Sequence, residues 1–348
     1  MNDCPALQGN AASCSSTGKL GICCNDPCIG QDAYLFSQDA QQRRAMLKSM
    51  ALTMQDKTFC KICLDTEASG NKSTRQWLNS RPDDYDLTIN VGNVCNLRCV
   101  MCRPEYSNLL SQDMSALPPE LTAYYKMPKM PKFSLAKNKR NQIERFISSI
   151  HQPINLNVIG GEPLADTDII EWLTDCLKNF SNIKIMRLNT NLTFNDRRTM
   201  RLAENEKVHI TASIDGHEDS FEWSRFGAAW DRIEQNVPHY KNVLGDRFAV
   251  HTTVHAISIL GDDLLTRWLA GLGIKQSKFI LTDPPFLSLR ILTDEERDTL
   301  KLWEIEPYDA DLRRKFSLYQ HSISSSRGKP IPNSIVKFYG LEVNKSCS

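Results

Sequence analysis

The sequence predicts an α/β fold of repeated strand–helix units, preceded by a small cysteine-rich segment. Between residues 85 and 290, short β-rich runs alternate with stretches of helical periodicity, a pattern typical of parallel βα units. Before residue 85, hydrophobic periodicity is weak, yet seven of the twelve cysteines lie there. We therefore divide the 348-residue chain into residues 1–84, 85–290 and 291–348. We expect the last part to be a helical extension that covers the central part or docks on the first.

Composition and charge favour an ordinary soluble globular protein. Apolar residues make up 41% of the chain, charged residues 24%, and the net charge is +1, so no electrostatic argument favours nucleic acid or an anionic membrane. No apolar run approaches the ~18 residues of a membrane helix. The first ten residues lack the basic and apolar regions of a secretory signal. We expect a cytoplasmic protein with no membrane partner and no nucleic-acid partner.

The grouping of the cysteines indicates metal binding. Eight of the twelve fall into three tight groups, at positions 23/24/28, 60/63 and 95/99/102. Grouped cysteines in a reducing cytoplasm are more often metal ligands than disulfides. Cys176 differs, because it lies on the apolar side of an expected helix that starts at Asp166 and is therefore expected to be a core thiol.

Six strands are expected, at residues 86–91, 154–159, 183–188, 208–214, 248–254 and 278–281. Five of these six runs carry alternating polar residues, whereas parallel strands buried on both faces are nearly all apolar. Because helices must cover one face, we expect the polar residues to point into a wide or open barrel. The alternative is that some of these strands are exposed edges.

Helices are expected between and after the strands. They are expected at residues 106–114, 141–150 and 310–321. A further helix is expected to start at the Thr293–Glu296 capping box and to continue to residue 303. The serine-rich residues 322–334 are expected to form a loop.

Residues 89–104, INVGNVCNLRCVMCRP, contain Cys95, Cys99 and Cys102 in a C-x3-C-x2-C spacing straight after the first strand. A [4Fe–4S] cluster is normally held by four thiolates, so a loop with three cysteines leaves one iron open to another ligand. The alternatives are a zinc knuckle and a chance grouping.

At these spacings the residues resemble the radical S-adenosylmethionine (radical SAM) enzymes. The resemblance implies that the open iron chelates the amino and carboxylate groups of SAM. An external one-electron donor such as flavodoxin or ferredoxin then drives cleavage of SAM to methionine and a 5′-deoxyadenosyl radical, which abstracts hydrogen from a substrate. It also implies a partial (β/α)6 TIM-like barrel, with which the six expected βα units agree.

The same resemblance assigns SAM-binding residues. The motif after the second strand, about sixty residues beyond the cysteines, is similar to the one that meets the SAM amino group. The Thr-Asn turn after the third strand is common in these enzymes, and the end of the fourth strand is expected near the SAM ribose or carboxylate. Arg225 is expected either to pair with that carboxylate or to lie on the surface. The residues assigned in this way are Gly160, Gly161, Glu162, Pro163, Asn189, Asn191, Ser213, Asp215, Arg225, His255 near adenine, and Met101 where the family often has an aromatic residue.

The catalytic residues are not identified from the sequence. His209, His251 and His255 are each a candidate proton donor or acceptor, but each is also explained as a hydrogen-bonded histidine of the barrel.

The first 84 residues resemble the SPASM and twitch modules, which hold auxiliary [4Fe–4S] clusters. Cys4 and Cys23 lie in a C-x13-G-x4-C pattern, and Cys60 and Cys63 form a C-x2-C pattern followed by Glu67, Gly70, Ser73, Arg75 and Asn79. The expected ligands are Cys4, Cys23, Cys60 and Cys63, with Cys24 and Cys28 as close competitors and Cys14 as a weaker one. Such modules usually follow the radical SAM core, whereas this one precedes it. A structural zinc site is the alternative.

The auxiliary module favours a peptide or protein side chain as the substrate. A small metabolite or a nucleotide is the alternative within the same class. An alternative from another class is a non-catalytic interaction protein that binds zinc at both cysteine groups.

Overall fold

The computed structural model describes residues 11–14, 20–21, 61–68, 72–81, 83–125, 129–302 and 306–341. The chain forms two compact units, which are treated separately below. Among these residues, the first unit comprises those up to Gly92 together with Phe133–Leu188 and Asn205–His209, and the second comprises those within Asn93–Lys132, Asn189–Glu204 and from Ile210 onward.

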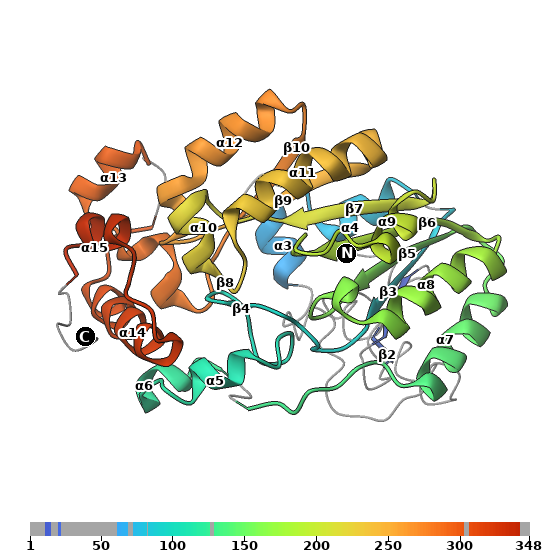
Figure 1. Ribbon diagram of the computed structural model, residues 1–348, viewed down its shortest axis with the longest axis horizontal. Helices are drawn as coiled ribbons and strands as arrows, with labels where there is room; N and C mark the ends of the chain where they lie inside the picture. The colour runs from blue at the N-terminus through green and yellow to red at the C-terminus, as the bar shows by residue number, and fades with distance from the viewer. Residues whose placement is uncertain are drawn as a thin grey trace. The chain divides into compact units, whose positions relative to one another are not determined.

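A mainly parallel sheet organises the first unit (Figure 1). Its strands are β1 (Ala11–Cys14), β2 (Leu20–Gly21), β3 (Tyr85–Asn90), β5 (Ile154–Ile159) and β6 (Ile183–Thr190), in the order β2-β1-β3-β5-β6. Among these described strands, the β1–β2 pair is antiparallel and the other pairs are parallel. β7 (Val208–Ser213) begins in this unit, where the Met186 amide donates to the carbonyl of Lys207 at 2.8 Å, and continues into the second unit.

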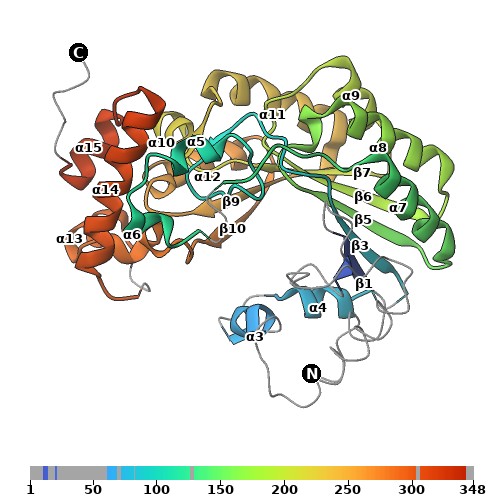
Figure 2. The same cartoon turned by 90° about the horizontal axis from the view of Figure 1, so that it is seen from below.

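Two long helices of the first unit lie side by side, α7 and α8 (Figure 2). Its helices are α3 (Lys61–Ala68), α4 (Thr74–Asn79), α7 (Lys137–Ser149), the 3-10 helix η1 (Pro163–Ala165) and α8 (Thr167–Asn179). Trp172 of α8 donates its indole N–H to Glu144 of α7 at 2.8 Å, which joins the two helices. The helix expected to start at Asp166 starts at Thr167, and the Asp166 side chain caps it by accepting from the amide of Asp168.

The second unit contains parallel strands and a separate two-stranded ribbon. β9 (Phe248–Val254) pairs in parallel with β7 and with β10 (Lys275–Ile280), and the ribbon joins β4 (Arg98–Cys99) to β8 (Arg225–Phe226). The α-helices are α5 (Leu110–Met114), α6 (Pro119–Thr122), α9 (Arg197–Ala203), α10 (Glu218–Ser224), α11 (Trp230–Leu244), α12 (Asp262–Gly271), α13 (Asp294–Leu300), α14 (Ala310–Arg327) and α15 (Asn333–Tyr339). Short 3-10 helices cover Gly245–Arg247, Ser258–Gly261, Pro285–Leu287 and Leu289–Ile291. Among the described helices, none has both the length and the apolar character needed to span a bilayer.

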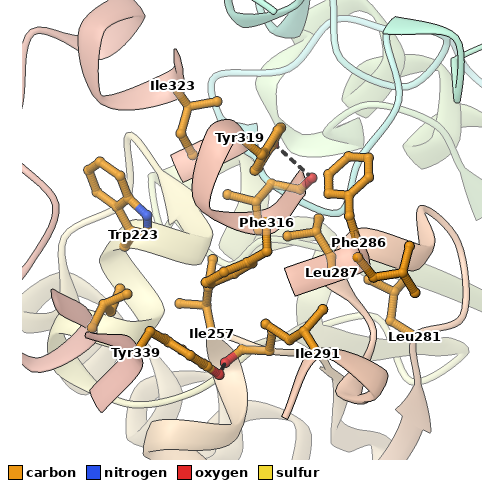
Figure 3. Close-up of a cluster of buried hydrophobic side chains, with 14 of the residues drawn as sticks. Trp223, Ile257, Leu281, Phe286, Leu287, Ile291, Phe316, Tyr319, Ile323 and Tyr339 are labelled. Atoms are coloured by element: carbon orange, nitrogen blue, oxygen red, sulfur yellow. Dashed lines mark hydrogen bonds between the residues drawn. The ribbon is translucent and has the colours of Figure 1, made fainter. Parts of the chain in front are cut away.

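The C-terminal helices of the second unit are part of its hydrophobic core. Figure 3 shows Phe316, Tyr319 and Ile323 of α14 among buried side chains that include Trp223 and Phe286. α14 and α15, red in Figure 1, lie side by side, and the rings of Phe316 and Tyr339 are 4.8 Å apart. The expected helical extension is therefore built into this unit.

The α/β class and the expected strands are confirmed, with small differences at their ends. β10 begins at Lys275, three residues before the expected start at residue 278. β1 was not expected, and it extends the parallel sheet by pairing with β3. A parallel sheet of this kind is consistent with a partial TIM-like core.

The helix boundaries needed more correction. Residues 106–109, expected to be helical, form turns because Asn108 and Ser107 hydrogen-bond to the carbonyls of Asn93 and Leu97. α7 begins four residues before the expected start at residue 141, and α14 continues to Arg327 through serines that were expected to form a loop. The capping box of Thr293 is confirmed, but its helix, α13, ends at Leu300 and not at residue 303.

The alternation of polar residues along the strands corresponds to a difference in burial. In β9, Phe248, Val250 and Val254 are buried, whereas His251 and Thr253 on the other face are partly exposed. Asn155 of β5 departs from this pattern because it is fully buried and donates to Asp84 at 3.0 Å. Most of the polar face is therefore more accessible than the apolar face, as expected for strands covered by helices on one side only.

Truncation of the core of the second unit is expected to destabilise the protein. Phe316→Ala removes a ring with no solvent exposure and should lower the free energy of unfolding by about 3–5 kcal/mol, through lost burial and the cavity left behind. The matched control is Phe279→Ala, because Phe279 is 53% exposed on β10 and its truncation should cost less than ~1 kcal/mol. Thermal or urea denaturation followed by circular dichroism measures both, and equal losses would contradict this account of the core.

Candidate metal centre

The cysteine loop is held by the β4–β8 ribbon. In this antiparallel pair Cys99 lies opposite Arg225, and Arg98 lies opposite Phe226. After β4 the chain turns, and the Cys102 amide donates to the Cys99 carbonyl at 3.1 Å. The ribbon therefore brings the middle cysteine of the C-x3-C-x2-C motif next to an arginine that is distant in the sequence.

Asn93 organises the base of the loop. Its side chain is fully buried and donates to the carbonyls of Pro104 and Pro131, at 3.3 and 3.0 Å. Its own carbonyl accepts from the Asn108 amide at 2.9 Å, while the Asn108 side chain accepts from the Cys95 amide at 3.2 Å. Amide side chains thus close the base of the loop, in addition to the strand pairing that holds Cys99.

The turn after β6 contacts the same loop. Asn191 donates to the Asn96 side chain at 2.9 Å, and Asn96 donates to the hydroxyl of Thr193 at 3.0 Å. The Asn191 carbonyl oxygen also accepts from the amide and hydroxyl of Thr193. The sequence placed Asn191 near SAM; in the structure its side chain supports the loop between Cys95 and Cys99.

Arg225 forms a buried ion pair. Its guanidinium lies 2.6 Å from the carboxylate of Asp215, and its Nη1 lies 3.9 Å from the Cys99 sulfur. The other Asp215 oxygen accepts from the Thr253 amide at 2.6 Å. Burial raises the pKa of Asp215, and the facing guanidinium opposes that shift. Of the two positions expected for Arg225, the surface position is excluded, because the residue is only 8% exposed.

His255 is fully buried directly after β9. Its Nδ1 accepts from the Ile257 amide at 3.3 Å, which places the proton of the neutral ring on Nε2. Burial, and then the charge of Arg225, lowers the pKa of His255 to about 3, so the ring is neutral near pH 7. Its Nε2 has no hydrogen-bond partner among the described residues, and neither does Nε of Arg225. Buried donors of this kind require a partner, and a bound ligand provides one.

The thiols themselves fit a metal centre. Cys99 is buried, whereas Cys95 and Cys102 are half-buried. Burial, followed by the neighbouring Cys99, raises the pKa of Cys102 to about 12, and burial also raises the pKa of Cys99. Both side chains are therefore neutral thiols near pH 7 unless a metal displaces their protons, as cysteine ligation requires.

No group of three or more His, Cys, Asp or Glu side chains within the described ranges is gathered closely enough to hold a single metal ion. A [4Fe–4S] cluster makes a different demand, because its thiolates bind separate irons and so lie farther apart than the ligands of one ion. Cys95, Cys99 and Cys102 are the residues that would hold such a cluster here, with the Arg225 guanidinium beside one of the sulfurs.

The Gly-Gly-Glu-Pro motif lies in the first unit, at the end of β5. Gly160 has a φ of +146°, and a Cβ there would lie 2.8 Å from the carbonyl oxygen of Gly92, so the position requires glycine. The Gly161 amide donates to that same carbonyl at 2.8 Å. Glu162 is 1% exposed and accepts from the Leu164 amide at 3.0 Å, just after which Pro163 begins η1. The close backbone approach expected at these glycines is therefore made to the carbonyl of Gly92, two residues after the end of β3.

The remaining expected SAM residues are placed as follows. Ser213 ends β7 opposite His251 of β9, Asn189 lies near the end of β6, and Met101 packs against the core of the second unit. Their roles toward SAM remain predictions. The two other candidate histidines are partly exposed, and His251 exchanges a hydrogen bond with Ser277 at 2.9 Å.

Most of the expected auxiliary ligands, namely Cys4, Cys23, Cys24, Cys28 and Cys60, lie outside the described residues. Cys63 is in α3, and Cys14 is buried in β1. Three residues of the motif that follows Cys63 do interact: Glu67 accepts from Ser73 and forms an ion pair with Arg75. Cys176 is buried in α8, which confirms that it is a core thiol.

Comparison with known families decides the class of the central region. Residues 89–261 match the family described as the Radical SAM superfamily. The chain belongs to the radical SAM superfamily. The matched range includes the cysteine loop, the Gly-Gly-Glu-Pro motif, Arg225 and His255.

Similar proteins are known from several organisms. The GTP 3′,8-cyclase of Listeria monocytogenes is 26% identical over 197 residues, which is 54% of this chain and 50% of that protein. This chain thus spans about half the length of the curated relatives that it matches. Two solved structures are similar: tagged anSMEcpe with bound AdoMet (17% identity, 59% of this chain and 53% of that chain, TM-score 0.46) and Streptococcus suis SuiB bound to S-adenosylmethionine (14%, 86% and 56%, 0.44).

Loss of the Asp215 carboxylate is expected to destabilise the second unit. Asp215→Asn leaves the Arg225 guanidinium buried without a countercharge and should lower the free energy of unfolding by about 3–5 kcal/mol. Asp263→Asn is the control, because the pair of Asp263 with Arg267 on α12 is exposed and its loss should cost no more than ~0.5 kcal/mol. Urea denaturation measures the difference. If Asp215→Asn were as stable as the control, the ion pair would not be the stabilising contact described here.

Proposed function

We propose that this chain is a radical SAM enzyme whose [4Fe–4S] cluster is held by Cys95, Cys99 and Cys102. When bound, the cluster and SAM together supply a 5′-deoxyadenosyl radical for hydrogen abstraction from a substrate, after one-electron reduction by an external donor such as flavodoxin or ferredoxin. A reducing cytoplasm stays our prediction for the compartment, because the ligand thiols must remain reduced.

The single observation that carries the proposal is the pairing of Cys99 with Arg225 inside the matched domain. The ribbon fixes the thiol at the centre of the C-x3-C-x2-C loop, and the guanidinium beside it opposes the rise in the pKa of that thiol that burial causes. A buried positive charge also favours an anionic iron–sulfur centre, whose potential depends on nearby charge and hydrogen bonds to sulfur.

The polar atoms around this ribbon are those that a SAM site needs. Arg225 and His255 each keep one buried N–H without a partner among the described residues. SAM carries a carboxylate and an adenine, which are acceptors for such donors, whereas the SAM amino group requires acceptors. The Gly160–Pro163 motif stays our candidate for that second task on the strength of the sequence resemblance, and Ser213, Asn189, Asn191 and Met101 stay candidates for contacts to other parts of the cofactor.

The test is SAM cleavage by the anaerobically reconstituted protein. With dithionite and SAM, wild-type protein should form 5′-deoxyadenosine, measured by liquid chromatography with mass spectrometry. Cys99→Ala should abolish this product, because a ligand of the cluster is lost. Cys176→Ala is the matched control, because Cys176 is buried in α8 and is distant in sequence from the loop. This variant should leave both the iron content and the amount of product unchanged.

Metal analysis distinguishes the proposed radical SAM enzyme from the alternative of a non-catalytic protein that binds zinc. Iron with equimolar sulfide and a brown colour is expected. Colourless protein that carries zinc in place of iron, or iron-loaded protein that forms no 5′-deoxyadenosine, would overturn the proposal.

We further propose a second cluster and a peptide or protein side chain as the substrate. Support comes from the motif that follows Cys63, whose members Glu67, Ser73 and Arg75 are connected by hydrogen bonds and an ion pair. The ligands proposed are Cys4, Cys23, Cys60 and Cys63. A nucleotide is the second candidate, because curated relatives that match about half their length are GTP 3′,8-cyclases.

Iron counting and isotope transfer test these finer proposals. Wild-type protein should bind about eight irons per chain, and the Cys95/Cys99/Cys102→Ala triple variant about four, as expected for two [4Fe–4S] clusters. Deuterium should appear in 5′-deoxyadenosine when a deuterated peptide mixture is supplied, but not with deuterated GTP. About four irons in the wild-type protein would contradict the second cluster, and transfer from GTP would favour the nucleotide.

A further inference from the structure

The last turn of α14 contacts the cysteine loop of the second unit, although α14 lies beyond the residues that match the family. Arg327, the final residue of this helix, has a fully buried side chain, as does its ion-pair partner Asp113 of α5. Burying a charge lowers the stability of the protein unless all of its hydrogen-bond donors have partners. A buried arginine such as Arg327 therefore points to specific contacts that it makes.

The contacts of Arg327 define that task. Its Nη2 donates to the carbonyl of Arg98 in β4 at 2.7 Å, and its Nη1 donates to the carbonyl of Trp223 at 3.1 Å. Trp223 lies two residues before Arg225 of β8. One guanidinium therefore bonds to the main chain of β4 and to the main chain just before β8. These are the two strands that bring Cys99 and Arg225 together.

Asp113 keeps this guanidinium in place. Both Nε and Nη2 of Arg327 donate to the same Asp113 oxygen, at 3.0 and 2.9 Å, and Arg98 donates to the other oxygen at 3.0 Å. The guanidinium also lies over the ring of Phe226, 4.6 Å from its centre. Every nitrogen of Arg327 thus has a partner, and its orientation is fixed.

A second side chain of α14 acts on the other side of Cys99. The hydroxyl of Tyr319, which is fully buried, donates to the carbonyl of Val100 at 3.2 Å. The Val100 amide donates to Ser224 at 2.8 Å. The main-chain groups before and after Cys99 are therefore both held by α14.

We propose that Arg327 and Tyr319 are positioning residues for the cluster: α14 clamps the main chain around Cys99 so that its sulfur is presented to the iron. The inference rests on the proposed function, because it assigns a cluster to this loop. It adds that the binding loop is incomplete without a helix from outside the family-matched range.

The test compares variants of α14 in the full-length protein. Arg327→Met removes the guanidinium but keeps an unbranched side chain, and Tyr319→Phe removes only the hydroxyl. Arg314→Met is the matched control, because Arg314 is on the same helix but is 55% exposed in its pair with Glu120. Hydrogen exchange of the metal-free protein, measured by mass spectrometry, reports on the loop independently of any cluster.

Amide exchange of the peptide that contains residues 98–102 should be about tenfold faster in Arg327→Met and about threefold faster in Tyr319→Phe, because charged hydrogen bonds contribute more than neutral ones. A peptide from β9 should be unchanged. After reconstitution, iron bound per chain should fall in Arg327→Met. In Tyr319→Phe the electron paramagnetic resonance spectrum of the reduced cluster with SAM should shift while iron content stays near that of wild type.

Each outcome decides between the two proposals. Loop exchange, iron content and spectrum equal to those of Arg314→Met would overturn the clamp and leave the radical SAM proposal intact. Faster loop exchange in variants of a protein whose wild type binds no iron would support the clamp and refute the cluster. If Arg327→Met does not fold, Tyr319→Phe alone decides, and an unchanged loop and spectrum in that variant count against the inference.

Discussion

The candidate site depends on a single short contact, the antiparallel pairing of β4 with β8. Two residues on each strand provide too few hydrogen bonds to be stable alone. The pair persists because side chains hold it: Arg225 lies beside Cys99 and is paired with Asp215, and Arg327 bonds to the carbonyl of Arg98 in β4 and to that of Trp223, two residues before β8. Without those contacts the cysteine spacing would remain in the sequence but would not define a site.

Buried positive charge is the electrostatic counterpart of this arrangement. Burial raises the pKa of Cys99 and so favours a neutral thiol, whereas Arg225 and Arg327 oppose that shift. Arg225 is paired with Asp215, which it does not share with another arginine among the described residues. Asp113, in contrast, pairs with both Arg98 and Arg327, so the group formed by Asp113, Arg98 and Arg327 has a net charge of one positive. The neighbouring positive charge thus reduces the cost of an anionic ligand set in a loop whose burial otherwise favours neutral thiols.

The sequence predicted what depends on local pattern. Strands β5 and β9 have the expected bounds because their alternating residues reflect a buried and an accessible face. The end of α14 was missed because serine is a weak helix former, yet burial of Ile323 and Arg327 makes this turn helical. The role of Arg327 could not be predicted, since its partner Arg98 is 229 residues away and no local motif marks the contact.

The order of these segments along the chain has a consequence for assembly. The ribbon joins residues near position 98 to residues near position 225, and the clamp comes from residue 327. Contacts between such distant segments form only when most of the chain has folded. On the proposed role of α14, the loop reaches its binding geometry only after α14 has packed, so that cluster binding would depend on completion of the fold. The proposed site therefore needs a helix beyond residues 89–261, the range that matches the family.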